Sequence, residues 1–130
     1  MRTDRRLTLL FCCLLALLAL PTQAVDRIHA GQWETSSTVN GHARTHSACA
    51  PQSDADAMNS DSGAIKALLQ AQLPPVCKVT DVQAKGDTVL VTTDCAGSKN
   101  TSTTHYHGDS YDSVSSNGTV IAAKRVGACK

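Results

Sequence analysis

The sequence predicts a mainly β protein, an antiparallel meander curled into a small barrel or sandwich, stapled by disulfides, with one short helix packed on it. Three observations lead to this expectation. Runs rich in Val and Thr, which favour strands, recur along the chain. Short turn signals such as Asn40-Gly41 and Asn117-Gly118 separate these runs. The four cysteines beyond residue 24 are an even number, as in small disulfide-stapled domains.

The chain begins with the pattern of a secretory signal peptide. A basic start is followed by an apolar stretch from Leu7 to Leu20 and by small residues suited to cleavage at Thr22-Gln23-Ala24. The apolar stretch is shorter than the roughly 20 residues that a membrane-spanning helix needs. An uncleaved N-terminal anchor is the alternative. We expect a signal peptide over 1–24 and a single small β-rich domain over 25–130, located in the periplasm without stable membrane insertion after cleavage.

The predicted mature chain is close to neutral. Cleavage after residue 24 would remove three arginines and one aspartate, which leaves nine Lys and Arg against ten Asp and Glu. This balance provides no attraction for polyanions, so the sequence predicts no nucleic-acid partner.

The first predicted hairpin spans residues 31–50. Its strands run from Gln32 to Val39 and from His42 to Cys49, joined by the two-residue turn signal Asn40-Gly41. Trp33 is the only tryptophan and is expected to anchor the core rather than to form a ligand platform.

A helix is expected over Ser62–Gln72, after a polar loop over Pro51–Ser62. Pro74-Pro75 stops the helical pattern. The apolar residues that recur at helical spacing are Ile65, Leu68, Leu69 and Leu73. We expect this face to pack on the sheet; a partner-binding face is the alternative.

The stretch from Cys77 to Cys95 reads as a second hairpin with two possible registers. A two-residue loop at Lys85-Gly86 would place the two cysteines on opposite faces. A three-residue loop at Lys85–Asp87 would place them directly opposite each other. The second register also pairs Lys78 with Asp94 and Val82 with Leu90, so we favour it.

Three further strands are expected over residues 99–107, 110–116 and 119–128. The preferred hairpin register predicts a Cys77–Cys95 disulfide, which leaves Cys49 to pair with Cys129. Metal ligation by the four thiolates is the alternative, but no CxxC spacing occurs and export favours oxidation.

Histidines offer the one candidate metal site. His105 and His107 would share a strand face, as would His42 and His46, and imidazole binds Zn or Cu well. Asp109 could add an oxygen ligand. The competing interpretation is that these are polar residues on solvent-facing strands. A histidine-based metal-binding envelope protein is therefore the alternative function.

Enzyme signatures are missing from the sequence. There is no GxSxG, HExxH, Walker or CxxC motif, and Asp54 with Asp56 reads as a solvated acidic loop. We therefore expect a small binding or interaction module without catalytic activity and without a cofactor. Its partner would be an unknown small ligand or an envelope protein.

Several short motifs in a fixed order resemble an exported bacterial family catalogued as domain of unknown function 3617. The resemblance covers essentially all of the predicted mature chain and implies a small β-rich domain in a Gram-negative envelope, with no assigned activity. The motifs are Gly31-Gln32-Trp33-Glu34, Cys49 before an acidic loop, Cys77 to Val82, Asp94-Cys95, Gly108 to Tyr111 and Arg125 to Cys129.

Mass spectrometry of the exported, non-reduced protein tests these expectations together. We expect an N-terminus at Val25 and peptides linked through Cys77–Cys95 and Cys49–Cys129. An intact N-terminus would contradict the signal peptide. Free thiols with bound metal would instead favour the metal-binding alternative.

Overall fold

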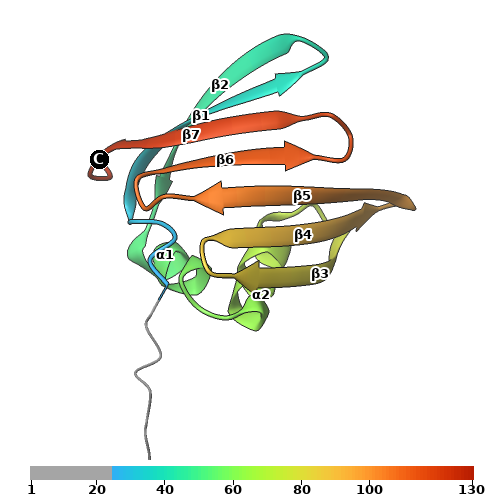
Figure 1. Ribbon diagram of the computed structural model, residues 1–130, viewed down its shortest axis with the longest axis horizontal. Coiled ribbons are helices and arrows are strands. Elements are labelled where there is room, and N and C mark those ends of the chain that lie inside the picture. The colour runs from blue at the N-terminus through green and yellow to red at the C-terminus, as the bar shows by residue number, and fades with distance from the viewer. Residues whose placement is uncertain (1–24) are drawn as a thin grey trace, which may run out of the picture.

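A computed structural model describes residues 25–130, so the predicted signal peptide lies outside the described residues. Seven strands and two helices follow one another within residues 25–130 (Figure 1). They are β1 (Gly31–Val39), β2 (His42–Ala50), α1 (Gln52–Met58), α2 (Ser62–Gln72), β3 (Cys77–Lys85), β4 (Thr88–Cys95), β5 (Ser98–Tyr106), β6 (Ser110–Ser115) and β7 (Val120–Gly127).

All seven strands form one antiparallel sheet in the order β2-β1-β7-β6-β5-β4-β3. Strands β3 to β7 make the predicted meander, and the β1–β2 hairpin adds to it through β1 and β7. The mainly β expectation is thus confirmed. The sheet is open, with β2 and β3 at its two edges, so it is neither a closed barrel nor a two-sheet sandwich.

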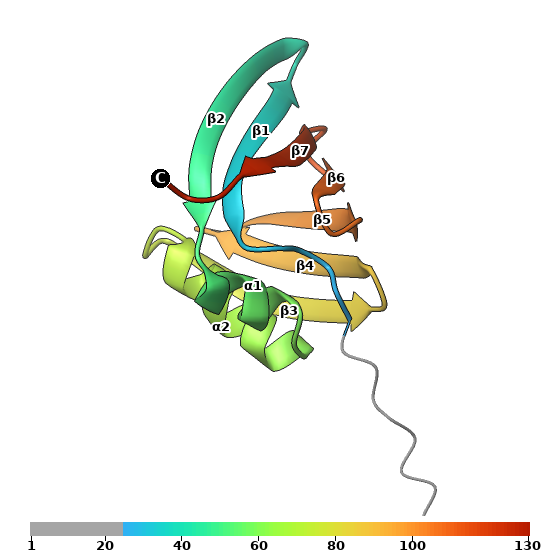
Figure 2. The ribbon, with the colours of Figure 1, turned by 90° about the vertical axis from the view of Figure 1, so that its left-hand side faces the viewer.

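The two helices explain why the curled sheet stays open. Figure 2 shows a strongly curved sheet, with α1 and α2 on its concave side at the lower end of β2 and beside β3. The helices connect the two edge strands in sequence and pack on β3 and on each other. Because this segment occupies the concave side between the edges, β2 and β3 do not pair.

The β1–β2 hairpin has the predicted two-residue turn. Val39 pairs with His42, and both loop residues take a positive φ, 50° at Asn40 and 79° at Gly41. An Asn-Gly pair adopts this left-handed backbone at low cost, which fixes the register of the whole hairpin.

The β3–β4 hairpin is as predicted at its disulfide end, where Cys77 pairs with Cys95 and Lys78 with Asp94. The predicted turn is wrong. Lys85 pairs with Thr88, so the loop contains two residues rather than three.

A β-bulge between Val79 and Asp81 reconciles the two ends of this hairpin. The bulge inserts one extra residue into β3, which shifts the pairing and sets Val82 opposite Val91 instead of Leu90. The Gln70 side chain of α2 supports the bulge. Its Oε1 accepts from the Val79 N–H at 2.7 Å and its Nε2 donates to the Cys77 carbonyl at 3.1 Å. The helix therefore satisfies backbone groups on this sheet edge.

Helix α2 has the predicted bounds. The Asp61 side chain caps it by accepting from the Ala64 N–H at 2.9 Å, and Ile65 is fully buried in the core. Helix α1 lies where a loop was expected. It buries only Ala55 and Met58, so its polar sequence showed no helical stripe.

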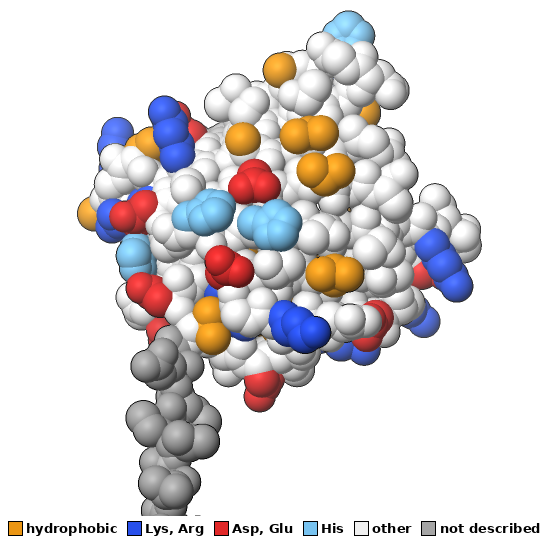
Figure 3. All heavy atoms as spheres, viewed as in Figure 1, with side chains coloured by type: hydrophobic (Ala, Val, Ile, Leu, Met, Phe, Trp, Pro, Cys, Tyr) orange, Lys and Arg blue, Asp and Glu red, His pale blue; other side chains and the backbone are white. Residues whose placement is uncertain are grey.

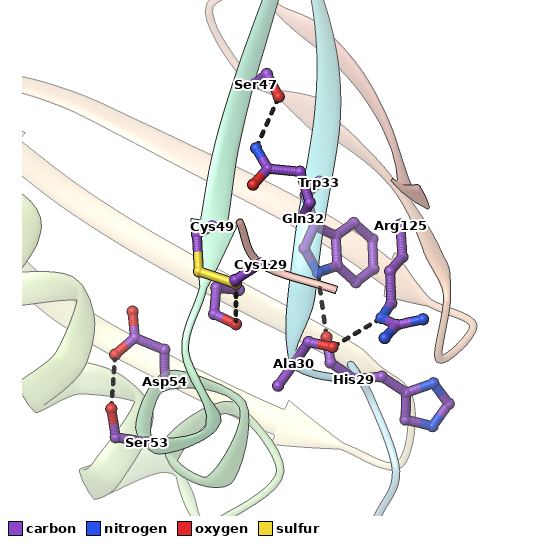
Figure 4. The surroundings of a disulfide bond; sticks show 11 residues. His29, Ala30, Gln32, Trp33, Ser47, Cys49, Ser53, Asp54, Arg125 and Cys129 are labelled. Carbon is purple, nitrogen blue, oxygen red and sulfur yellow. Dashed lines mark hydrogen bonds between the residues drawn. A yellow bond between two sulfur atoms is a disulfide. The ribbon is translucent and has the colours of Figure 1, made fainter. Parts of the chain in front are cut away.

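The structure contains both disulfides that the sequence predicts. Cys77–Cys95 closes the β3–β4 hairpin. Cys49–Cys129 joins the end of β2 to the C-terminus, which follows β7 (Figure 4). Because β1 lies between β2 and β7, this bridge fastens both neighbours of β1 at one end of the sheet.

One buried arginine anchors the segment that precedes β1. Arg27 is 3% exposed, and its guanidinium donates to the carbonyls of Met58 at 2.7 Å, Gly86 at 2.8 Å and Ser60 at 2.9 Å. A buried charge is costly unless it is hydrogen-bonded, and three carbonyl acceptors offset that cost. The side chain joins the N-terminal segment, the end of α1 and the β3–β4 turn.

Asn59 completes this anchor. Its Oδ1 accepts from the backbone N–H groups of Arg27 at 2.7 Å and Ile28 at 3.0 Å, and its Nδ2 donates to the Ile28 carbonyl at 2.8 Å. The end of α1 is thereby held against the N-terminal segment.

Replacing Arg27 with Ala is expected to destabilise the fold by about 3 kcal/mol, because buried carbonyls would lose their donors. Urea unfolding measures the change. The matched control is Arg44→Ala on the exposed strand β2, which should change stability by no more than about 0.5 kcal/mol. Equal effects of the two substitutions would contradict the anchoring role.

Candidate functional site

A cavity of about 270 Å³ is lined by residues of the sheet and of the two helices. Strands β1, β2, β5 and β6 contribute to its wall, and α1 and α2 close its other side. Its lining is mainly apolar and aromatic, as is typical of small-molecule sites. The lining residues are Ile28, Trp33, Thr35, Ala48, Cys49, Ala50, Asp54, Met58, Leu68, Leu69, Gln72, Tyr106 and Tyr111.

Three aromatic rings form the sheet side of the cavity. The ring centroids of Trp33 and Tyr111 are 5.6 Å apart, and those of Tyr111 and Tyr106 are 5.5 Å apart. Strand β7 separates β1 from β6, but it places Ala123 opposite Tyr111. The small side chain at this position leaves room for the rings to meet across β7.

Hydrogen bonding and burial fix these aromatic side chains. The Trp33 Nε1–H donates to the His29 carbonyl at 3.1 Å, which orients the indole (Figure 4). Burial raises the pKa of Tyr106 to about 12, so its phenol stays protonated and uncharged at neutral pH.

The helix side of the cavity combines apolar residues with one polar link. Met58 of α1 and Leu68 and Leu69 of α2 face the aromatic rings across the cavity. Asp54 of α1 accepts from the Gln72 side chain of α2 through Oδ2 at 3.2 Å. The carboxylate therefore stands in the lining, where it both links the helices and can meet a ligand.

His29 forms a second cluster beside the cavity wall. Its Nδ1 lies 2.8 Å from Asp109 Oδ1, and its Nε2 lies 2.9 Å from Asp26 Oδ2. Hydrogen bonds to Asp109 and then to Asp26 raise the pKa of His29, because both carboxylates favour the imidazolium. Since the His29 carbonyl holds Trp33, this cluster helps to fix the segment that leads into β1.

The four histidines of the metal hypothesis do not come together. His42 and His46 lie on β2, whereas His105 lies on β5 and His107 directly follows it. Four strand-to-strand steps separate β2 from β5, which amounts to about 19 Å along a sheet. The two pairs therefore lie on well-separated strands of the sheet.

His105 and His107 have different hydrogen-bond partners. His105 lies 3.1 Å from the Thr88 hydroxyl, and His107 lies 3.3 Å from an Asp112 oxygen. Figure 3 shows two histidines side by side on one exposed face, near carboxylates. Asp109, the suggested oxygen ligand, instead contacts His29.

The part of the chain that the structure describes contains neither a cluster of metal-binding side chains nor a helix able to span a membrane. No three His, Cys, Asp or Glu side chains within 25–130 are grouped so that they could hold a metal ion. Over the same part of the chain, every helix is too short or too polar to cross a membrane.

The sequence alone did not identify two residues of this region, His29 in the hydrogen-bonded cluster and Asp54 in the cavity lining. His29 was the one histidine left out, and Asp54 was assigned to a solvated loop. The i, i+3 spacing of Asp26 and His29 was the only local signal, because Asp109 lies 80 residues further along the chain.

Comparison with known proteins identifies a family but no activity. The family described as "Protein of unknown function (DUF3617)" matches residues 28–129. No curated protein and no solved structure matches the chain.

The His29 cluster predicts a pH dependence of stability. Because the pKa of His29 is raised in the folded protein, its contribution is fully present below its unfolded pKa of about 6.5 and is lost as pH rises through the folded pKa. Urea unfolding at about pH 6 and pH 8.5 should show that wild type loses more stability with rising pH than His29→Gln does. His42→Gln, at an exposed site on β2, is the control and should behave as wild type. Parallel curves for wild type and His29→Gln would contradict the prediction.

Proposed function

The chain belongs to the DUF3617 family of proteins of unknown function, and we propose that it is a small exported binding module that takes an apolar small molecule. The observation that carries this proposal is the aromatic-lined cavity on the concave face of the sheet. Ligand sites are usually concave and largely apolar, with a few polar groups that orient the ligand. The cavity has this composition, and hydrogen-bonded strands form its sheet wall.

Binding without catalysis fits the side chains in the lining. They include no histidine, serine or lysine, and the one cysteine, Cys49, is in a disulfide. Nucleophilic catalysis needs a nucleophile within hydrogen-bond reach of a base. A carboxylate bonded to an amide, as in Asp54 with Gln72, is better suited to orienting a ligand.

A periplasmic location is part of the same proposal. Two disulfides in a domain of this size are typical of proteins that fold in an oxidising compartment. The signal-peptide pattern of residues 1–24 supports export from the cytoplasm.

Binding of an apolar probe, with and without a bulky side chain in the cavity, tests the proposal. The uncharged fluorescent probe N-phenyl-1-naphthylamine should bind saturably, with one site per chain. Ala48→Phe should weaken binding by about tenfold or more, since Ala48 lines the cavity and a bulky ring there would occupy the ligand's space. Fluorescence titration measures both affinities.

The control is Ala43→Phe, at an exposed position on the same strand but outside the lining. Residues 43 and 48 differ by an odd number, so their side chains point to opposite faces of β2. Ala43→Phe should bind the probe as wild type does. Unsaturable probe binding, or equal weakening by both substitutions, would overturn the proposal.

A further inference from the structure

Among residues 25–130, Asp54 is the only carboxylate that lines the cavity. It is half-buried, and its side-chain partners are the Gln72 amide at 3.2 Å and the Ser53 hydroxyl at 3.5 Å. An ionised carboxylate offers about four acceptor positions, so these two long contacts leave capacity for another donor. The cavity thus presents one partly desolvated negative charge beside apolar walls.

The facing wall is aromatic and uncharged. Trp33, Tyr111 and Tyr106 pack in a row along the sheet, and burial raises the pKa of Tyr106 to about 12, so its phenol carries no charge at neutral pH. Aromatic faces attract cations through their quadrupole when the cation lies within about 6 Å of the ring centroid. The rings and Asp54 line the same cavity of about 270 Å³, so both attract a cation that is held there.

The chain around Asp54 is acidic and lacks Lys and Arg. Residues 45–65 include three aspartates and neither basic residue type. The nearby Arg27 is outside the lining, and its guanidinium is already bound to three backbone carbonyls. A positive ligand therefore meets Asp54 without a lysine or arginine in the cavity wall.

We propose that the ligand of this cavity is an organic cation, an amine or quaternary ammonium with an apolar body. The Asp54 carboxylate and the aromatic row both attract its positive group, and its apolar part packs against the apolar lining, which includes Met58, Leu68 and Leu69. This inference rests on the proposed binding function and adds the charge of the ligand to it.

Three probes with the same eight-carbon chain separate charge from apolar binding. Octylammonium, 1-octanol and octanoate are each used to displace N-phenyl-1-naphthylamine at about pH 7 and low salt. Octylammonium should bind about fivefold more tightly than 1-octanol, and octanoate should bind more weakly than both. Added salt should reduce the preference for octylammonium.

Two aspartates of the same helix supply the variant and its control. Asp54→Asn should abolish the preference for octylammonium over 1-octanol while 1-octanol still binds. Asp56→Asn should keep the preference, because Asp56 is exposed, bonds to Gln52 and does not line the cavity.

The outcomes distinguish the two proposals. If 1-octanol displaces the probe but octylammonium is no tighter, the cation inference is overturned and the apolar binding function stands. The same holds if Asp54→Asn keeps the preference or if Asp56→Asn loses it. If none of the three compounds displaces a saturably bound probe, both proposals are overturned.

Discussion

The burial of the Arg27 guanidinium is the interaction on which the arrangement of this protein depends. Three carbonyls from the end of α1 and from the β3–β4 turn converge on one side chain of the N-terminal segment. Buried carbonyls need hydrogen-bond donors, and a buried guanidinium needs acceptors. The hydrogen bonds between them satisfy both groups. The contact holds α1 on the concave side of the sheet, where it forms one wall of the cavity.

The position of the cavity depends on where the helices and the strands are attached to one another. The Cys49–Cys129 bridge fastens the β2 end of the sheet, and Gln70 fastens α2 to the β3 edge. Between these two attachments, the aromatic row packs along the sheet, and Trp33 is hydrogen-bonded to the segment before β1. A preformed, apolar space with one carboxylate in its lining is the result.

The Asp26–His29–Asp109 cluster is exposed to solvent. It lies on the exposed side of the same N-terminal segment whose other side carries the buried Arg27. Buried contacts thus determine where the segment runs. On its exposed side, one imidazole lies between two carboxylates, which raise the pKa of His29.

The sequence by itself determined the strands, the helix α2 and the Asn40-Gly41 turn, because each depends on local patterns. The disulfide pairing was predicted correctly from a loop length that is wrong, because the bulge in β3 brings Cys77 opposite Cys95. The sequence misassigned α1 and the β3–β4 turn, since α1 buries only two side chains and the bulge near Thr80 has no local signature. Only the tertiary structure decided that the sheet stays open and that Trp33, Tyr106, Tyr111 and Asp54 line one cavity. These relations join residues far apart in the chain, and packing between the helices and the sheet fixes them rather than any local preference.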